Sequence, residues 1–573
     1  MSWTREVDMA FRKFMVYMLI LGFSTVPVRS SDKSNKKEPL AAETLYNGIT
    51  LPDKWPPQLE ELTRQPMPVP YLESPPEVIL IDVGRQLFVD DFLIEHTTLK
   101  CSYHRPQYHP DNPILKPDKP WERGDSARAA APFSDGVFYD PKEKLFKIWY
   151  MGGYIASTCL AVSRDGIRWE KPSFDVRDGT NEVLSHRGVE PAGGGRYRDS
   201  STVWLDLEDP NPQHRYKMFV TTPIPQRWSL ALRCSADGIH WSEPVATSAT
   251  KIGDRTTVHY NPFRKKWVFG LRIGRSGVGR SRAYFEHSDA IAGTRQTANG
   301  AVLWLCADDL DPHHPDPKYN NIEPQLYNHD AVAYESLMLG LFSIWQGPPN
   351  SECARLKIQK RNEVLVGFSR DGFHWHRPDR TRFLTVNPTE GAWNWGNVQS
   401  AGGCCLVVRD KLYFYVSGRM LGDGFWDGNC HTGLAIMRRD GFASMDAGEE
   451  PGTLTTRPVR FKGKYLFINV DNPNGQLRVE VLTKDKRLIE GLSIENCNPV
   501  SGDSTIQQVI WNSGKDLSSV AGKPVRFKFR LKNGRLYSFW ISPDKSGASF
   551  GYVGAGGPGF TGPKDTVGKA AYK

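Results

Sequence analysis

The chain of 573 residues is long enough for several domains, and its 73 Lys and Arg against 64 Asp and Glu give a net charge of +9. The basic residues form no run of five or six, which argues against a nucleic-acid partner and favours a mixed solvated surface. With 52 Gly, 41 Pro and 11% aromatic residues, the composition favours many short strands joined by turns over long helices.

The N-terminus has the pattern of an export signal. Basic residues up to Lys13 precede an apolar run at 14–23, and small and polar residues follow, with cleavage expected near Ser30. The run is short for a bilayer span, and no other segment is long and apolar enough for a membrane helix. We therefore expect a signal peptide at 1–30 and a secreted or periplasmic protein, with an uncleaved anchor as the alternative.

A repeated box is the strongest motif of the chain. The pattern S-x-D-G-x-x-W-x-x-P occurs at 163–172, 235–244 and 369–378, with degenerate copies around Asp289 and Asp440. Short apolar strands precede each copy, and such repeats indicate a modular architecture. Five units of irregular length predict a five-bladed β-propeller. Because Asp-Gly favours a tight turn, we expect the box to be structural, with its Trp between neighbouring blades.

The units define the expected domain organisation. A Pro-rich linker or surface arm spans 31–76, the propeller spans 77–450, and alternating strands at 451–545 predict a β-sandwich. A Gly- and Pro-rich tail at 546–573 is expected to be loosely ordered. The expected fold class is all-β, a five-bladed β-propeller followed by a C-terminal β-sandwich.

The nine cysteines include no C-x-x-C pair and no zinc spacing. Buried free thiols are the favoured interpretation, with one or two disulfides after export as the alternative. Nothing in the sequence implies a cofactor or a metal site, although a structural calcium ion at a propeller axis stays open.

Candidate functional residues lie where the inner strands of the blades begin, because a propeller binds ligands at its axis. The candidate catalytic residues are Asp135, Asp199, Asp254, Asp330 and Glu335. The candidate substrate-binding residues are Arg128, Arg198, Arg255, His329, Trp395, Asn397 and Gln399. Counting from the shared strands places Asp199, Asp254 and Asn328 at one blade position, and Asp135 and Asp330 at another.

Carboxylates that face one another across an axis suit cleavage of a glycosidic bond. One carboxyl donates a proton to the leaving oxygen, and another activates water or attacks the sugar. The alternative is that these residues lie in turns or at blade edges and accept backbone hydrogen bonds. The ring as a whole predicts a carbohydrate-binding surface.

Five blades, the Arg198-Asp199 pair at the start of the second blade and a trailing sandwich resemble the clan of glycoside hydrolase families 32 and 43, over about 120–545. The resemblance implies Asp135 as base or nucleophile and Asp199 as stabiliser. The clan's third-blade Glu is missing, since that blade offers Asp254, and the Asn-Asp-Pro-Asn-Gly motif of family 32 is absent. The acid is left among four candidates: Asp254, Glu323, Asp330 and Glu335.

Two functions therefore remain: a divergent exported glycosidase, or a non-catalytic carbohydrate-binding propeller. The box also resembles the longer Asp box of sialidases, and Arg128, Arg198 and Arg255 could imitate their arginine triad. No Tyr–Glu pair stands out to complete that site, so the sialidase interpretation is the weaker one.

Overall fold

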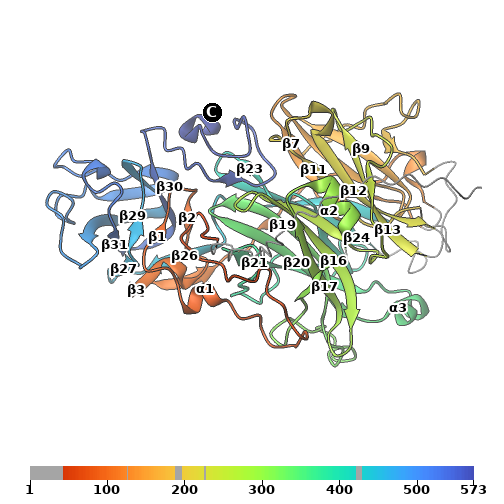
Figure 1. The fold of residues 1–573 in the computed structure, drawn as a ribbon, viewed down its shortest axis with the longest axis horizontal. Coiled ribbons are helices and arrows are strands. Elements are labelled where there is room, and N and C mark those ends of the chain that lie inside the picture. The colour runs from red at the N-terminus through yellow and green to blue at the C-terminus, as the bar shows by residue number, and fades with distance from the viewer. Residues whose placement is uncertain (1–42, 125–126, 187–196, 225–226, 298, 421–428) are drawn as a thin grey trace, which may run out of the picture. The chain divides into compact units, whose positions relative to one another are not determined.

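The computed structural model describes residues 43–124, 127–186, 197–224, 227–297, 299–420 and 429–573 (Figure 1). The signal peptide expected at 1–30 lies outside these residues. The few helices are short and lie in connections: α1 (Pro70–Glu73), α2 (Ala290–Gln296) and α3 (Asn350–Leu356). Within the described part of the chain, no helix is long and apolar enough to cross a membrane.

The first three predicted blades are separate antiparallel sheets. The first holds β6 (Ala130–Ala131), β7 (Val137–Asp140), β8 (Leu145–Gly152), β9 (Ser157–Ser163) and β10 (Glu182–Leu184). The second holds β11 (Ser201–Leu205), β12 (Tyr216–Ile224), β13 (Arg227–Ser235) and β14 (Ala246–Thr247). The third holds β15 (Thr257–Asn261), β16 (Lys266–Arg275), β17 (Gly279–His287) and β18 (Val302–Leu305).

The fourth and fifth predicted blades lie in one nine-stranded sheet. Its fourth-blade strands are β19 (Gln325–Glu335), β20 (Leu337–Gly347) and β21 (Arg361–Ser369). Its fifth-blade strands are β22 (Asn397–Ser400), β23 (Leu406–Val408), β24 (Lys411–Arg419) and β25 (Cys430–Arg438). The parallel pair of Asn362 with Asn397 joins the two groups. Strand β5 (Gln107–Tyr108) pairs with β25, so the N-terminal part of the chain completes the last group.

The repeated box has the structural role that the sequence predicts. In the first copy, Asp165 Oδ1 accepts hydrogen bonds from the backbone N–H groups of Ile167 and Arg168, each at 2.8 Å. Gly166 has a φ of +75°, which an L side chain would strain. The Gly166 carbonyl accepts a hydrogen bond from Tyr415 of the fifth group at 2.7 Å. The box therefore closes a turn and ties its blade to a neighbour.

The other two copies repeat this inter-blade contact. Trp149 of the first sheet donates to the carbonyl of Gly238 in the second box at 2.9 Å. Trp304 of the third sheet donates to the carbonyl of Phe373 in the third box at 2.8 Å. The same device thus recurs between three pairs of neighbouring groups.

The remaining strands form an 11-stranded sheet that folds into a β-sandwich. Strand β29 (Tyr465–Thr483) serves both layers, since its first half pairs with β32 (Gly534–Ser542) and its second half with β31 (Val525–Lys532). Phe527 and Phe529 of β31 pack against Phe539 of β32 across the core. The other strands are β1 (Ile79–Leu80), β2 (Gln86–Leu87), β3 (Ile94–Thr97), β4 (Lys100–Tyr103), β26 (Ala443–Ala447), β27 (Gly452–Thr456), β28 (Val459–Arg460) and β30 (Val500–Gln508).

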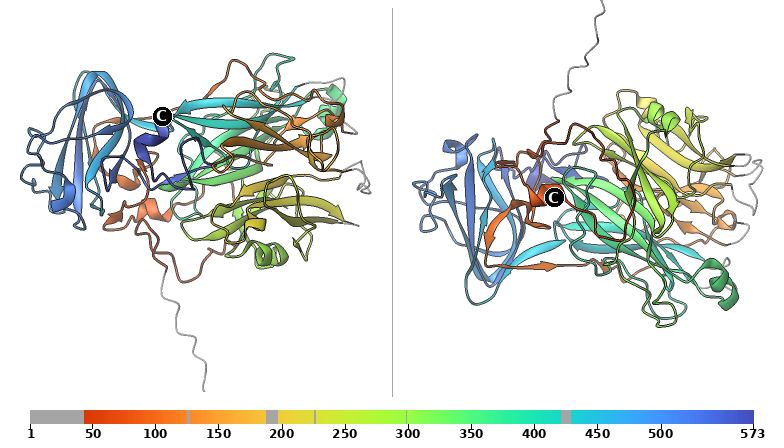
Figure 2. Two further views of the ribbon diagram at one scale, coloured as in Figure 1. Left: turned by 90° about the horizontal axis from the view of Figure 1, so that it is seen from above. Right: turned by 60° about the horizontal axis from the view of Figure 1, so that its bottom comes forward.

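The strands of the sandwich sheet do not all lie within the domain boundaries that the sequence predicts at 77 and 451. Strands β1 to β4 and β26 pair within the sandwich sheet, although they precede the expected boundary at 451 and follow the one at 77. The chain builds part of the sandwich, passes through the propeller and returns, as the two orientations in Figure 2 show. The sequence of a short strand does not show which sheet it joins when its partner strands are far away in the chain.

The tail at 546–573 is packed, so the expectation of loose order is wrong. Strand β33 (Tyr552–Val553) pairs with the end of β19. The Tyr139 N–H donates to the Ala555 carbonyl at 2.9 Å, and the Val407 N–H donates to the Gly556 carbonyl at 2.9 Å. The tail thereby hydrogen-bonds to inner strands of three blades, and its glycines allow that close approach: a Cβ at Gly557 would lie 1.7 Å from the Val407 carbonyl oxygen.

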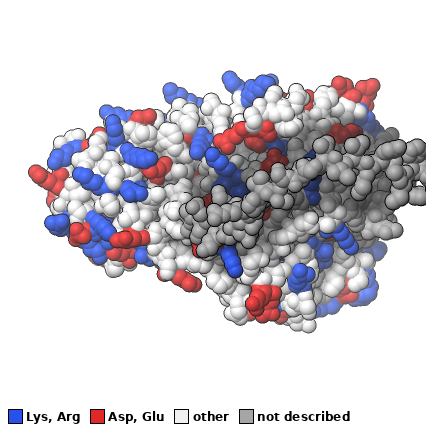
Figure 3. All heavy atoms as spheres, in the orientation of Figure 1, with Lys and Arg blue, Asp and Glu red and all other residues white. Residues whose placement is uncertain are grey.

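All nine cysteines are free thiols, as the favoured interpretation expected. Seven are buried, Cys306 is half-buried and Cys101 is exposed. Acidic and basic side chains alternate over the face shown in Figure 3, outside the atoms drawn in grey, without a continuous region of one sign.

Candidate functional site

The inner strands converge through contacts that cross from blade to blade. Ser200 Oγ donates to the Asp254 carbonyl at 3.0 Å, which joins the second sheet to the third. Thr257 Oγ1 donates to the His329 carbonyl at 2.7 Å, which joins the third to the fourth. The starts of the inner strands therefore form one cluster, which we call the axial cluster and which includes Ser134, Asp135, Arg198, Asp199, Asp254, Arg255, Asn328 and Asp330.

Asp135 belongs to this cluster. Its side chain is fully buried and forms an ion pair with Arg198. Both carboxylate oxygens accept hydrogen bonds from the Arg198 guanidinium, one of them at 2.9 Å. Burial raises the pKa of Asp135, while Arg198 acts in the opposite direction. The preceding residues Phe133 and Ser134 have φ of 39° and 83°, a strained turn of the kind that recurs at functional sites.

Asp199 and Asp254 are the carboxylates of the axial cluster that remain partly exposed. The Asp199 side chain is 14% exposed and lies 3.3 Å from Arg255 Nε. The Asp254 side chain is 31% exposed and lies 3.6 Å from Arg272 Nε. Both carboxylates raise the pKa of Arg255, so they lie near one guanidinium group.

Asp330 links three blades through neutral hydrogen bonds. Its Oδ2 accepts from Ser134, Asn328 and Ser400, at 3.2, 2.9 and 2.5 Å. Burial raises the pKa of Asp330, and these donors together with nearby arginines oppose that rise. Asp330 therefore holds the ring together from a buried position, 3% exposed.

Two cation–tyrosine pairs belong to the axial cluster and were not predicted from sequence. Lys360 Nζ donates to Tyr327 OH at 2.8 Å, and the Arg419 guanidinium lies 4.3 Å from the centre of the Tyr154 ring. Burial by itself raises the pKa of Tyr327, but Lys360 and Arg255 outweigh it and bring the pKa to about 8. Lys360 precedes β21, Tyr327 lies within β19, Arg419 ends β24 and Tyr154 follows β8. None of them belongs to a sequence motif, so only their convergence identifies them.

The other predicted binding residues fall into different surroundings. Arg255 contacts the axial cluster directly and donates to the Phe133 carbonyl at 3.3 Å. Gln399 Nε2 donates to Asn397 Oδ1 at 2.8 Å, and both are buried beside Lys360, whose carbonyl Asn397 contacts. Trp395 is half-buried and Arg128 is exposed.

His329 points away from the axial cluster. Its ring lies among the aromatic rings of Trp304, Phe342 and Trp375, with centroid distances of 5.2, 4.6 and 4.8 Å. Burial lowers the pKa of His329 well below its usual value, so it is a neutral core residue. Side chains alternate along a strand, which sends His329 to the face opposite its neighbours Asn328 and Asp330.

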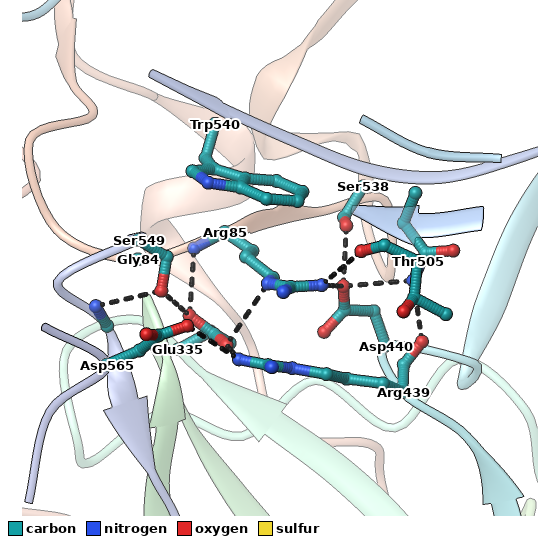
Figure 4. Close-up of polar contacts among 12 residues, drawn as sticks. Gly84, Arg85, Glu335, Arg439, Asp440, Thr505, Ser538, Trp540, Ser549 and Asp565 are labelled. Atoms are coloured by element: carbon teal, nitrogen blue, oxygen red, sulfur yellow. Dashed lines mark hydrogen bonds and ion pairs between the residues drawn. The ribbon is translucent and has the colours of Figure 1, made fainter. Parts of the chain in front are cut away.

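Glu335 does not join the axial cluster. It lies at the far end of β19, where Figure 4 shows it between Arg85 and Arg439 in a second, buried cluster of charges. Arg439 Nη2 lies 2.8 Å from Glu335 Oε1 and 3.0 Å from Asp565 Oδ2, while Arg85 Nη1 lies 3.0 Å from Asp440 Oδ2. We call these residues the interface cluster, since they come from the propeller, the sandwich and the tail. Glu335 is therefore too enclosed to meet a substrate.

Among the described residues, no group of three or more His, Cys, Asp or Glu side chains is arranged to hold a metal ion.

No family model matches the chain, and no curated protein matches it by sequence. Solved structures similar to the chain include a fructofuranosidase from Schwanniomyces occidentalis, at 11% identity and a TM-score of 0.35 over 76% of this chain and 97% of that one. An exo-inulinase from Aspergillus awamori matches at 13% identity and a TM-score of 0.33, over 77% and 99%. A thermostable family-43 glycoside hydrolase matches at 10% and 0.36, over 55% and 92%. Such scores establish nothing about activity, and the propeller and sandwich rest on the sheets described above.

Proposed function

We propose that the chain is an exported glycoside hydrolase that cleaves a glycan at the propeller axis. The observation that carries the proposal is the pair of partly exposed carboxylates, Asp199 and Asp254, on neighbouring inner strands beside arginines and aromatic rings. Glycosidases need two carboxyl groups with different protonation states around one bond. The basic and apolar N-terminal pattern at 1–30 supports export.

The surroundings of the two carboxylates suggest their roles. Asp199 lies 3.3 Å from Arg255, and we assign it the role of base or stabiliser. Asp254 is more exposed, with its nearest guanidinium 3.6 Å away, and we assign it the contact with the leaving oxygen. Asp135, whose oxygens are both engaged by Arg198, positions Arg198 and the Asp199 backbone rather than attacking a sugar.

A non-catalytic carbohydrate-binding propeller is the second candidate. The burial of Asp135 favours it, because the residue that the resemblance implies as nucleophile is 0% exposed and ion-paired. In this case Asp199 and Asp254 would accept hydrogen bonds from sugar hydroxyl groups, and the protein would bind the glycan without cleaving it.

The experiment measures release of reducing sugar from a panel of neutral and acidic glycans by the wild type, Asp199→Asn and Asp254→Asn. We expect each variant to lose roughly 10²- to 10⁴-fold in kcat, the range that positioned acids and bases contribute. The exposed carboxylate of Asp178, far along the chain from both, provides the matched control Asp178→Asn, which should retain full activity.

Glycan binding without turnover by the wild type would favour the binding propeller. Turnover that survives both Asn substitutions would refute the assignment of these two residues.

A further inference from the structure

The axial cluster holds more positive charge than its carboxylates can balance. Among the described residues its carboxylates are Asp135, Asp199, Asp254 and Asp330, and its cations are Arg198, Arg255, Arg272, Arg280, Arg282, Lys360 and Arg419. Arg198, Arg255 and Arg272 each have a carboxylate partner in the structure. The other four cations have none among the residues that the structure describes, and three of them, Arg282, Lys360 and Arg419, are buried, which is unusual for unpaired charges.

Lys360 is the clearest uncompensated cation. It is 5% exposed, and its ammonium donates to a neutral partner, the Tyr327 hydroxyl, while the Tyr327 ring lies 4.5 Å away. Burial lowers the pKa of Lys360. Lys360 and Arg255 lower the pKa of Tyr327, and the group that faces the Lys360 ammonium is a tyrosine hydroxyl and not a carboxylate.

Arg419 adds guanidinium donors that no described residue accepts. The residue is 3% exposed, and its Nε and Nη2 have no hydrogen-bond partner among the residues that the structure describes. Its backbone pairs with Asn397, whose side chain in turn contacts the Lys360 carbonyl, so the two cations come from neighbouring strands. Arg280 lies 5.7 Å from the same Tyr327 ring and donates to Gln325 at 2.9 Å.

Arg282 differs from these cations, because most donors of its guanidinium form hydrogen bonds within the protein. It donates to the carbonyls of Gly270 and Tyr327 and to Asn328 Oδ1, at 3.1, 2.8 and 3.0 Å. It contributes positive potential, and its Nε is the guanidinium nitrogen left without a hydrogen-bond partner among the described residues. The cations without a carboxylate partner therefore gather around two tyrosine rings: Lys360 and Arg280 contact the Tyr327 ring, and Arg419 contacts the Tyr154 ring.

We infer that this part of the axial cluster binds the anionic group of an acidic sugar, either the carboxylate of a uronic acid or a sulfate ester. The inference rests on the proposed function and specifies its substrate class. A planar guanidinium and an ammonium on opposite sides of an anion supply charge-assisted hydrogen bonds, and burial strengthens them. The Tyr154 and Tyr327 rings offer apolar faces against which a sugar ring can pack.

The test is a calorimetric titration of the full chain with three sets of probes: oligogalacturonates and oligoalginates, sulfated carrageenan oligosaccharides, and neutral xylo-oligosaccharides. We expect an acidic set to bind at least tenfold more tightly than the neutral set, with an affinity that falls as salt rises. The first two arms distinguish carboxylate from sulfate recognition.

Substitutions of Lys360 and Arg419 test where the anionic group of the probe binds. Lys360→Met and Arg419→Met should each weaken binding of the acidic probe at least tenfold, Arg419→Lys should weaken it less, and neutral probes should be unaffected. Lys523→Met, which removes an exposed lysine of the sandwich, is the matched control and should bind as the wild type does.

Equal binding of acidic and neutral glycans, no binding of any acidic probe, or full binding by both Met variants would overturn the inference. The failure of the proposed function looks different. Acidic glycans would then bind tightly without being cleaved, whereas cleavage of neutral glycans with no preference for acidic ones would leave the proposed function standing alone.

Discussion

Two clusters of buried charge lie along the same strand, β19, and they are built differently. At its middle, Asp330 belongs to the axial cluster; five residues later, roughly 16 Å along the strand, Glu335 belongs to the interface cluster. In the interface cluster two arginines meet three carboxylates, Glu335, Asp440 and Asp565, and every member is fully buried. In the axial cluster several cations have no carboxylate partner within the part of the chain that the structure describes.

The difference separates stability from binding. The Arg85 guanidinium is hydrogen-bonded to Thr505, ion-paired with Asp440 and stacked 4.1 Å from the Trp540 ring, so carboxylates of the protein balance its charge. Arg419 has no carboxylate partner among the described residues, and its Nε and Nη2 have no hydrogen-bond partner there. The paired charges of the interface cluster stabilise the contact between its elements, and the unpaired cations of the axial cluster are the basis of the proposed anion site.

The largest expected effect comes from breaking the interface cluster. Arg439→Met leaves Glu335 and Asp565 buried without their shared partner, so we expect the free energy of unfolding in urea to fall by roughly 3–5 kcal/mol. Arg438→Met, one residue earlier, removes an arginine whose partner Asp503 is 60% exposed and should lose about 1 kcal/mol or less. Equal losses in the two variants would contradict the distinction.

The next effect concerns the core between the two clusters, where His329 packs against His259 with ring centroids 6.1 Å apart. Burial lowers the pKa of His259 to about 3 and that of His329 well below its usual value. Both stay neutral in the folded protein while the unfolded chain takes up protons below about pH 6.5. The unfolded state therefore binds more protons, and stability falls as the pH falls from 6.5 toward the folded pKa values.

Between pH 7 and pH 5.5 each histidine should remove about 1 kcal/mol from the free energy of unfolding. Urea midpoints at the two pH values measure this loss. His259→Gln and His329→Phe should each flatten the dependence, and an unchanged slope in both variants would assign the acid sensitivity elsewhere.

The smallest effect has the opposite sign. Lys360→Met removes a buried cation that lacks a carboxylate, so we expect the variant to be about 1 kcal/mol more stable than the wild type. Lys147 provides the matched control: it is also buried against a tyrosine ring, but it lies 2.6 Å from Glu143 and 3.8 Å from Asp140. Lys147→Met should be destabilised, and loss of stability in both variants would show that Lys360 is compensated after all.

Much of the fold was predictable because its signals are local. The box needs only Ser163, Asp165 and Gly166 in one turn, and these residues form that turn through their own hydrogen bonds. Counting boxes was then enough to predict propeller units and to place Asp199 and Asp254 at their inner strands. The packed tail was missed because its glycines indicate flexibility in isolation, whereas here they allow backbone contact with Val407 and Tyr139.

The sequence by itself determined the repeating strands, their turns and the residue types at the start of each blade, since each depends on neighbours within a few positions. Only the tertiary structure decided how the charges pair. It joined Asp135 to Arg198, separated Glu335 from Asp330 by half the length of β19, and brought Lys360 and Arg419 together from separate parts of the chain. Whether a buried charge is balanced depends on residues that are distant in the sequence. No local sequence pattern therefore shows which buried cation lacks a partner.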